Sequence, residues 1–294
     1  MDKQTAEHEN PTEHLLGPRL QAVAAFVPQG ACLGDIGTDH AYLPITLYTK
    51  GLIKRTVAVD VHKGPYLSAF NAVRVRGLGG GIDVRLGDGL APVGPGEVDT
   101  LTMAGMGGRT ILDILAAGPQ VLKYVNDLIL QPQGLESGVR QHLLNEGWRL
   151  RDECLVEEDG RIYVVMAFSR LTGWGSEEIM DYIDVWIQDL LRPAEVRPGS
   201  VPVSEPDIEN LAKELFWQFG PLIWQRANDP NIGSENESAK DLLSRQLAAR
   251  QRDINKRLNE MQNARSPEVE LRCKQFRGEA VLLEKLICRL KQGK

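Results

Sequence analysis

The sequence predicts an α/β protein with a mainly parallel, doubly wound sheet that has an antiparallel edge, followed by a C-terminal helical, coiled-coil-like domain. Three observations predict this fold. Five strand-like runs alternate with helix-like runs between residues 31 and 146, as in the β-α units of a parallel sheet. Two extended runs then flank Glu158-Asp159-Gly160, and an Asp-Gly pair between extended runs is typical of a hairpin. From residue 239 onward the apolar residues have the spacing of long helices.

The elements of the α/β part follow one another along the chain. A first helix, with apolar residues at helical spacing, runs from residue 15 to 26 and ends at Pro28-Gln29-Gly30. Strands are predicted at 31–36, 55–61, 82–86, 98–104 and 127–131, and helices at 41–50, 65–76, 109–117 and 135–146. The hairpin strands are predicted at 148–157 and 161–169.

The C-terminal part is predicted to be helical. An amphipathic helix around residues 179–190 precedes a Pro-rich connector at 193–206 and a helix at 208–219. Two long helices, 239–262 and 268–291, are separated by Ser266-Pro267, and the second has a seven-residue apolar seam. We therefore expect an antiparallel helical hairpin. The predicted boundaries are a disordered tail at 1–14, an α/β domain at 15–170, a connecting segment with one helix at 171–204 and a helical hairpin domain at 205–294.

The charge distribution separates these two parts. The net charge is −6. Residues 236–294 carry fourteen Lys and Arg against eight Asp and Glu, a balance of +6, which leaves −12 for the first 235 residues. An acidic body with a basic helical end indicates two different tasks, and the basic end suits a nucleic acid.

Composition also excludes several classes of protein. No apolar run approaches the roughly 18 residues that a membrane helix needs, and the polar N-terminus resembles neither a secretory signal nor a transit peptide. The four cysteines form no C-x-x-C pair, which argues against a zinc site and a disulfide framework and favours the reducing cytoplasm. No metal, membrane or obligate protein partner is predicted.

Acidic residues and glycines follow the predicted strands where each strand ends. Asp35 and Gly37 follow the first strand, Asp60 ends the second, Asp88-Gly89 follows the third, and Gly105-Met106-Gly107 follows the fourth. Each of these alone would be read as an ordinary turn. Because the carboxyl ends of parallel strands meet at one edge, the set predicts a ligand site there.

The class of ligand is predicted from phosphate-binding motifs that are absent from the sequence. Only Gly37 of a G-x-G-x-x-G pattern is present after the first strand, and there is no P-loop, so a pyrophosphate cradle is disfavoured. S-adenosylmethionine fits better, because it has a ribose, an adenine and a zwitterionic end but no phosphate. A dinucleotide oxidoreductase is correspondingly disfavoured.

Six short strings follow the predicted strand ends and the entry to the helical domain, namely residues 34–45 (GDIGTDHAYLPI), 63–66 (KGPY), 85–90 (RLGDGL), 104–108 (AGMGG), 130–132 (LQP) and 219–222 (FGPL). Together they resemble the motifs of the bacterial TrmK family of S-adenosylmethionine-dependent tRNA methyltransferases. The resemblance implies a Rossmann-like class I methyltransferase domain and a C-terminal domain that helps hold tRNA. It also implies methylation of N1 of the adenine at position 22. Residues 174–215 look longer than the family's usual connection, and the acidic N-terminal tail is extra.

Site residues are assigned from the strand ends and from this resemblance. Asp60 is predicted to bind the cofactor ribose, Asp88 the adenine amine, and Asp35 and Gly37 the methionine end. The full predicted cofactor set is Arg19, Asp35, Gly37, Asp60, Asp88, Gly89, Gly105, Met106 and Gly107. Gln131 and Pro132 are predicted to border the pocket for the target base. Arg250, Arg252 and Lys256 are predicted to contact tRNA phosphates, with a solvated coiled-coil face as the alternative.

Asp39, His40 and Tyr42 are the predicted catalytic residues. The N1 lone pair of neutral adenine is nucleophilic without deprotonation, so methyl transfer needs alignment more than a strong base. Asp39 either accepts a hydrogen bond from the adenine N6 amine or positions the cofactor. His40 either meets the base or only orders the turn, and Tyr42 either stacks on the base or packs its helix.

Two other functions share part of this pattern. A methyltransferase acting on a small molecule or a protein would have the same first 170 residues but would not need the basic arm. A non-catalytic RNA-binding protein would have the arm but would not bind S-adenosylmethionine.

Overall fold

The computed structural model describes residues 16–191, 205–228, 234–261 and 266–292. The predicted tail at 1–14 and nearly all of the Pro-rich connector at 193–206 lie outside these ranges. The contacts divide the chain into two compact units. The first contains the residues up to Leu135 together with Val156–Leu171, and the second contains Glu136–Leu155 and the residues from Thr172 onward.

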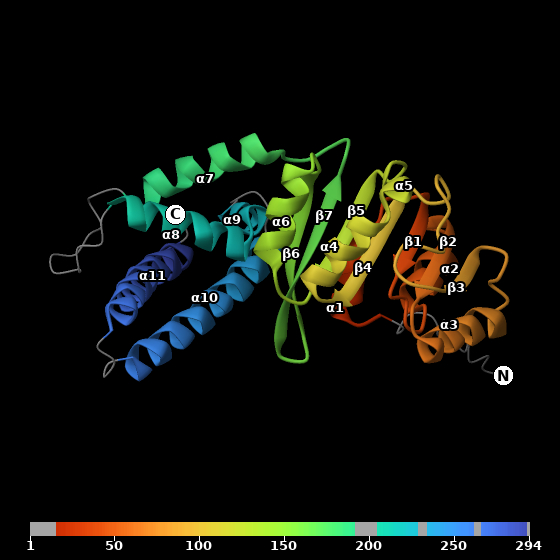
Figure 1. Ribbon diagram of the computed structural model, residues 1–294, viewed down its shortest axis with the longest axis horizontal. Helices are drawn as coiled ribbons and strands as arrows, with labels where there is room; N and C mark the ends of the chain where they lie inside the picture. The colour runs from red at the N-terminus through yellow and green to blue at the C-terminus, as the bar shows by residue number, and fades with distance from the viewer. Residues whose placement is uncertain (1–15, 192–204, 229–233, 262–265, 293–294) are drawn as a thin grey trace, which may run out of the picture. The chain divides into compact units, whose positions relative to one another are not determined.

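The described residues form one seven-stranded sheet with the strand order β3-β2-β1-β4-β5-β7-β6. Strands β1 to β5 are parallel to one another, and β7 pairs antiparallel with β5 (Figure 1). The mainly parallel sheet with an antiparallel edge is therefore confirmed. The strands are β1 Ala31–Ile36, β2 Ile53–Asp60, β3 Ile82–Leu86, β4 Thr100–Met106, β5 Asp127–Pro132, β6 Arg149–Glu158 and β7 Arg161–Ser169.

Five helices of the first unit accompany these strands, namely α1 Pro18–Phe26, α2 Tyr42–Thr49, α3 Lys63–Val75, α4 Gly108–Ala117 and α5 Pro119–Leu122. Helices α2 and α3 contact β2 and β3, and α4 contacts β4. The order of β1 in the middle of the parallel strands, with β2 and β4 on either side, places the switch in strand order at the end of β1. Open α/β sheets bind their ligands at such a point.

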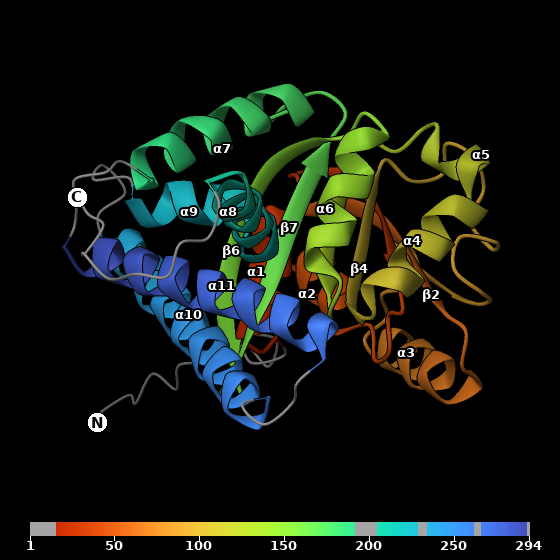
Figure 2. The ribbon, with the colours of Figure 1, turned by 60° about the vertical axis from the view of Figure 1, so that its left-hand side comes forward.

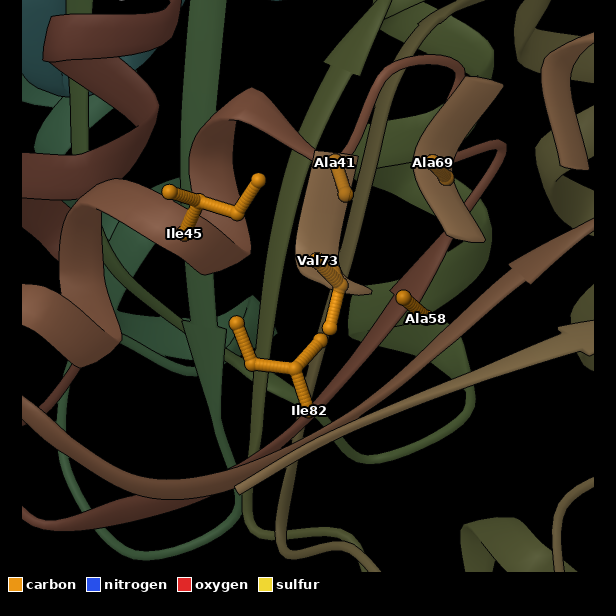
Figure 3. Packing of buried hydrophobic residues seen from close by; sticks show 6 residues of the cluster. All are labelled: Ala41, Ile45, Ala58, Ala69, Val73 and Ile82. Carbon is orange, nitrogen blue, oxygen red and sulfur yellow. The ribbon is translucent and has the colours of Figure 1, made fainter. Parts of the chain in front are cut away.

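Small side chains let α3 approach the sheet closely. Ala69 and Val73 of α3 lie in one cluster with Ala58 of β2, Ile82 of β3 and Ile45 of α2, and each is at most 4% exposed (Figure 3). Packing of this kind fixes where α3 begins, next to the carboxyl end of β2.

The second unit contains the remaining helices, α6 Glu136–Asn145, α7 Ser176–Leu190, α8 Glu205–Phe219, α9 Pro221–Asn228, α10 Ser234–Glu260 and α11 Pro267–Gln292. Helices α10 and α11 lie side by side in both views, as the predicted hairpin requires (Figures 1 and 2). The buried positions on α11 include Leu282, Leu283, Leu286 and Leu290, a wider stripe than the seven-residue seam.

A buried ion pair connects several elements of the second unit. Arg140 of α6 and Glu153 of β6 are both fully buried, with 2.7 Å between Arg140 Nε and Glu153 Oε2. Glu153 Oε1 accepts from the backbone N–H of Leu222, which satisfies the N-terminus of α9. Arg140 Nη1 donates to the carbonyl of Trp217 in α8. Gly220 between α8 and α9 has φ 98°, and a Cβ there would lie 2.6 Å from Glu153 Oε1, so only glycine fits.

Candidate active site

The turn after β1 is held in an unusual backbone conformation. Gly37, Asp39 and Ala41 all have positive φ, at 78°, 51° and 56°. The N–H groups of Gly37 and Thr38 both donate to the carbonyl of Val59 in β2, at 2.9 and 3.0 Å. Positive φ at non-glycine residues costs about 1–3 kcal/mol each and is concentrated at ligand-binding turns. The strain therefore supports the prediction of a ligand site at this turn.

Two buried carboxylates, those of Asp60 and Asp35, lie next to this turn. Asp60, at the end of β2, accepts from the N–H of Asp39 (3.1 Å) and from the N–H of His62 (2.9 Å). Asp35, near the end of β1, accepts a 2.6 Å hydrogen bond from Thr102 Oγ1. Burial raises the pKa of the Asp35 carboxyl above its usual value, against the lowering effect of that hydrogen bond. Asp60 thus ties the turn after β1 to the start of α3.

The glycine run at the carboxyl end of β4 faces the turn after β1. The strand runs to Met106, two residues beyond the predicted end at 104, so Gly105 and Met106 belong to the strand and not to the turn that follows it. A Cβ on Gly37 would lie 2.8 Å from Met106 Cε, so the absent side chain makes room for Met106. Gly105 is exposed and has φ 81°, and Gly107 is the N-cap of α4. The structure therefore brings the predicted residues of the first and fourth strand ends together.

The side chain of Gln131 supports the backbone of the glycine run. Its side chain is fully buried, and its Oε1 accepts from Arg19 Nη1 at 2.8 Å and from the N–H of Gly105 at 3.0 Å. Its Nε2 donates to the carbonyl of Pro132. The hydrogen bonds of Gln131 hold the backbone at Gly105 and do not show a pocket for a base. The role of Gln131 and Pro132 in bordering such a pocket therefore stays a prediction.

Arg19 joins the site through partners that the sequence did not reveal. Its Nε lies 3.1 Å from Glu158 Oε2, and its guanidinium lies 5.7 Å from the ring centroid of Tyr163. Neither partner, nor Thr102, was predicted. For Thr102 a signal existed, since a polar residue between the buried Leu101 and Met103 of a strand calls for a hydrogen-bond partner.

Asp88 and Gly89 follow β3 at the same edge. The N–H of Gly87 donates to the carbonyl of Asp60, which places the end of β3 beside the end of β2. Asp88 is exposed, whereas Gly89 is buried with φ 51°. Both line a pocket of about 510 Å³, whose walls also include Leu90, Val93, Pro95, Thr110, Ile114, Ala117 and Gly118.

The three predicted catalytic residues lie together and are exposed. The rings of His40 and Tyr42 stack with centroids 5.2 Å apart and planes 15° from parallel. His40 Nε2 lies 3.6 Å from Asp39 Oδ1. Stacking fixes the direction of His40, so the turn presents a flat aromatic pair beside a carboxylate.

The predicted tRNA-binding residues of α10 differ from one another. Arg252 and Lys256 are exposed. Arg250, by contrast, forms a 2.7 Å ion pair with Glu279 of α11, where the side chains are 29% and 10% exposed. Arg250 therefore ties the hairpin together, which limits its availability to a phosphate.

The described part of the chain has neither a cluster of metal ligands nor a helix suited to a membrane. No group of three or more His, Cys, Asp and Glu side chains there is arranged to hold a metal ion. Among the described helices, none has the length and apolarity that crossing a membrane requires.

A family model described as "Methyltransferase domain" matches residues 16–166, just over half of the chain. The chain belongs to this methyltransferase family. Its match covers the strand ends described above, from α1 to β7.

Individual relatives of the chain have more specific names than this family. The chain is 44% identical over 151 residues to the tRNA (adenine(22)-N(1))-methyltransferase of Bacillus subtilis (strain 168), an alignment that covers 51% of this chain and 63% of that protein. The chain is also 26% identical over 139 residues to a Mycoplasma genitalium protein named "Putative tRNA methyltransferase MG248", and this alignment covers 61% of that protein. The chain thus spans less than two thirds of these relatives.

Among solved structures, the similarity extends over most of the chain. The crystal structure of the B. subtilis m1A22 tRNA methyltransferase TrmK matches with a TM-score of 0.69 at 27% identity, over 93% of this chain and 100% of that one. A Streptococcus pneumoniae structure in complex with S-adenosyl-L-methionine matches with a TM-score of 0.61 at 30% identity, over 94% and 97% of the two chains.

Proposed function

We propose that this methyltransferase transfers a methyl group from S-adenosylmethionine to N1 of an adenine in tRNA, at position 22. The observation that carries the proposal is the 44% identity to the B. subtilis protein named for that reaction. The geometry of the sheet edge agrees with it, because the carboxylates and glycine turns needed for such a cofactor lie together.

The residues present fit S-adenosylmethionine. Each oxygen of the Asp60 carboxylate accepts one backbone N–H, and each retains a lone pair for a ribose hydroxyl. Asp35 is a buried carboxyl that a cationic amine of the methionine end would pair with, reversing the effect of burial on its pKa. Asp88, exposed at the pocket beside Gly89, can accept from an exocyclic amine. When bound, the cofactor supplies an electrophilic methyl group on its sulfonium.

The stacked pair His40 and Tyr42 would receive the target adenine. A base that has left its helix stack needs a flat surface to hold it, and aromatic side chains provide one. Asp39 beside the pair would accept from the adenine N6 amine and so direct N1 towards the proposed cofactor site. These residues align and desolvate the base; they do not remove a proton from N1 before transfer.

In the helical hairpin, the side chains of Arg252 and Lys256 would bind phosphates of the tRNA. Both are exposed on α10, and the last 59 residues carry a balance of +6. Because tRNA is the proposed substrate, we place the reaction in the cytoplasm.

The proposal is tested by a methyl-transfer assay with labelled S-adenosylmethionine and a tRNA transcript that carries adenine at position 22. A matched transcript has guanine at that position. We expect label in 1-methyladenosine with the first transcript and none with the second. Cofactor binding without label in either tRNA would instead indicate a small molecule or a protein as the substrate.

A further inference from the structure

Helix α3 carries an exposed aromatic and basic face that none of the roles above uses. Positions 63, 66, 67, 70 and 74 follow the spacing of three and four that brings side chains onto one side of a helix. Leu67 and Phe70 are each 43% exposed. This α3 face flanks the side on which Ala69 and Val73 enter the core (Figure 3).

The aromatic residues of the α3 face form a small platform. The rings of Tyr66 and Phe70 stack with centroids 6.1 Å apart and planes 29° from parallel. Leu67 lies beside them. Phe70 is exposed and Tyr66 is partly exposed. Solvent-accessible aromatic rings are the usual means by which proteins stack on unpaired nucleic-acid bases.

The charge on the α3 face favours a polyanion. Lys63 and Arg74 lie near its two ends and are exposed, and residues 63–75 contain no Asp or Glu. The described residues of the first unit, 16–135 and 156–171, carry twelve Lys and Arg against twelve Asp and Glu, so this unit has no net charge. A helix with only basic charges in a unit that is neutral as a whole indicates a local role for the charge. An ordinary protein interface would not require this absence of carboxylates.

The α3 face begins at the candidate active site. The N–H of His62, the N-cap of α3, donates to Asp60 Oδ1. From Lys63 to Arg74 the helix rises by about 16 Å. RNA flanking a base that is held at the turn after β1 would therefore lie within reach of α3.

We propose that the α3 face is a tRNA-binding surface of the methyltransferase domain, separate from the basic helical hairpin. Tyr66 and Phe70 stack on unpaired bases near the target, and Lys63 and Arg74 bind the neighbouring phosphates. This inference rests on the proposed function, because it assumes tRNA as the substrate.

The test compares the double variant Tyr66→Ala/Phe70→Ala with Tyr124→Ala, which removes a 50% exposed aromatic ring elsewhere in the same unit. We expect the double variant to raise KM and Kd for tRNA at least about fivefold, as the loss of base stacking does. The Kd for S-adenosylmethionine should not change, and Tyr124→Ala should match the wild type. Phe70→Trp should retain tRNA affinity, which separates stacking from a packing defect.

A second measurement tests the charges. Lys63→Gln/Arg74→Gln should lower the slope of log Kd for tRNA against log salt by about 1 to 2, since each lost phosphate contact removes about 0.7–0.9. If the wild type methylates tRNA and both double variants keep its tRNA affinity and salt slope, the α3 face is not a tRNA surface. Loss of self-association in those variants would then assign it to a second copy of the chain. If the wild type neither binds nor methylates tRNA, the proposed function fails as well.

Discussion

Asp60 connects two parts of the candidate cofactor site. Its two oxygens order the turn after β1 and the start of α3 through backbone N–H groups. A ligand hydroxyl that also bonds to Asp60 would therefore meet a carboxylate that is already oriented. Preorganisation of this kind is what makes a single residue important for affinity.

Asp60→Asn should weaken S-adenosylmethionine binding by about 10- to 100-fold, because hydrogen bonds to a charged group contribute about 1.5–3 kcal/mol. Isothermal titration calorimetry gives the Kd directly. Asp159→Asn at the exposed hairpin tip is the matched control, since Asn tolerates the φ of 51° at that position. An unchanged Kd in Asp60→Asn would remove the ribose-binding role.

Asp35 should give the protein a particular pH dependence of stability. Burial raises the pKa of Asp35 in the folded state above the usual 3.8. The folded state then binds the proton more tightly than the unfolded state, so this contribution is complete below the unfolded pKa and is lost as pH rises through the folded pKa.

The free energy of unfolding of wild type minus that of Asp35→Asn should therefore fall as pH rises above the unfolded pKa of about 4. Urea unfolding at a series of pH values measures this difference. The Asn side chain keeps an acceptor for Thr102 Oγ1, so the hydrogen bond is not the cause. A difference that stays constant or grows with pH would show that burial does not control this carboxyl.

At the residue scale, the sequence predicted which strand ends carry carboxylates and glycines, because those residue types are local signals. It could not predict what those residues contact. Gln131 accepts from Arg19, 112 positions away, and such pairs form only when the sheet is assembled. The roles of the individual site residues remain predictions.

At the scale of elements, strands β1, β3 and β7 have the predicted bounds, since short apolar runs between turn residues mark them clearly. Two short helices, α5 and α9, were not predicted. Each begins with proline directly after a glycine, a pattern that also suits a turn. For α9, the Glu153 carboxylate that accepts its first N–H groups is about 70 residues away.

Glu153→Ala should lower the free energy of unfolding of the second unit by about 3–5 kcal/mol, because it leaves the buried Arg140 without its partner. Urea unfolding followed by tryptophan fluorescence measures the loss. Arg140→Met/Glu153→Leu should lose less than Glu153→Ala alone, since it removes both charges. If the loss of unfolding free energy in the double variant equalled the sum of the losses in the two single variants, Arg140 and Glu153 would not be a coupled pair.

Arg250 and its neighbours on α10 should separate into two roles. Arg250→Gln should lower hairpin stability by about 1 kcal/mol at most, because its pair with Glu279 is only partly shielded from solvent. Arg252→Gln/Lys256→Gln should leave stability unchanged and reduce the salt dependence of tRNA binding. Thermal unfolding and filter binding distinguish these effects. If both variants lose tRNA affinity equally, Arg250 also contacts the tRNA.

At the scale of the whole molecule, the sequence did not indicate that residues 136–155 belong with the C-terminal helices. In the sequence, α6 reads as one more helix of the α/β alternation. The grouping arises from contacts such as the Arg140–Glu153 pair and its bonds to α8 and α9. The predicted domain boundaries at 170 and 204 remain predictions.

This division places every tryptophan of the chain in the second unit. The five residues are Trp148, Trp174, Trp186, Trp217 and Trp224. Three rings, Trp186, Phe216 and Trp224, form one aromatic cluster there, in which Phe216 and Trp224 are fully buried. Tryptophan fluorescence therefore reports on the second unit, while all the candidate cofactor residues belong to the first.

S-adenosylmethionine should consequently stabilise the first unit selectively. At a free concentration about 100 times its Kd, a ligand adds about 2.7 kcal/mol to the unit that binds it. Hydrogen exchange of β1 and β4 amides should slow accordingly, while the urea midpoint of tryptophan fluorescence should stay where it is without cofactor. In Asp60→Asn, the same cofactor concentration should no longer slow the hydrogen exchange of these amides. If the fluorescence midpoint rises as much as the exchange protection, the two units unfold as one, and the cofactor site stabilises the helical unit as well.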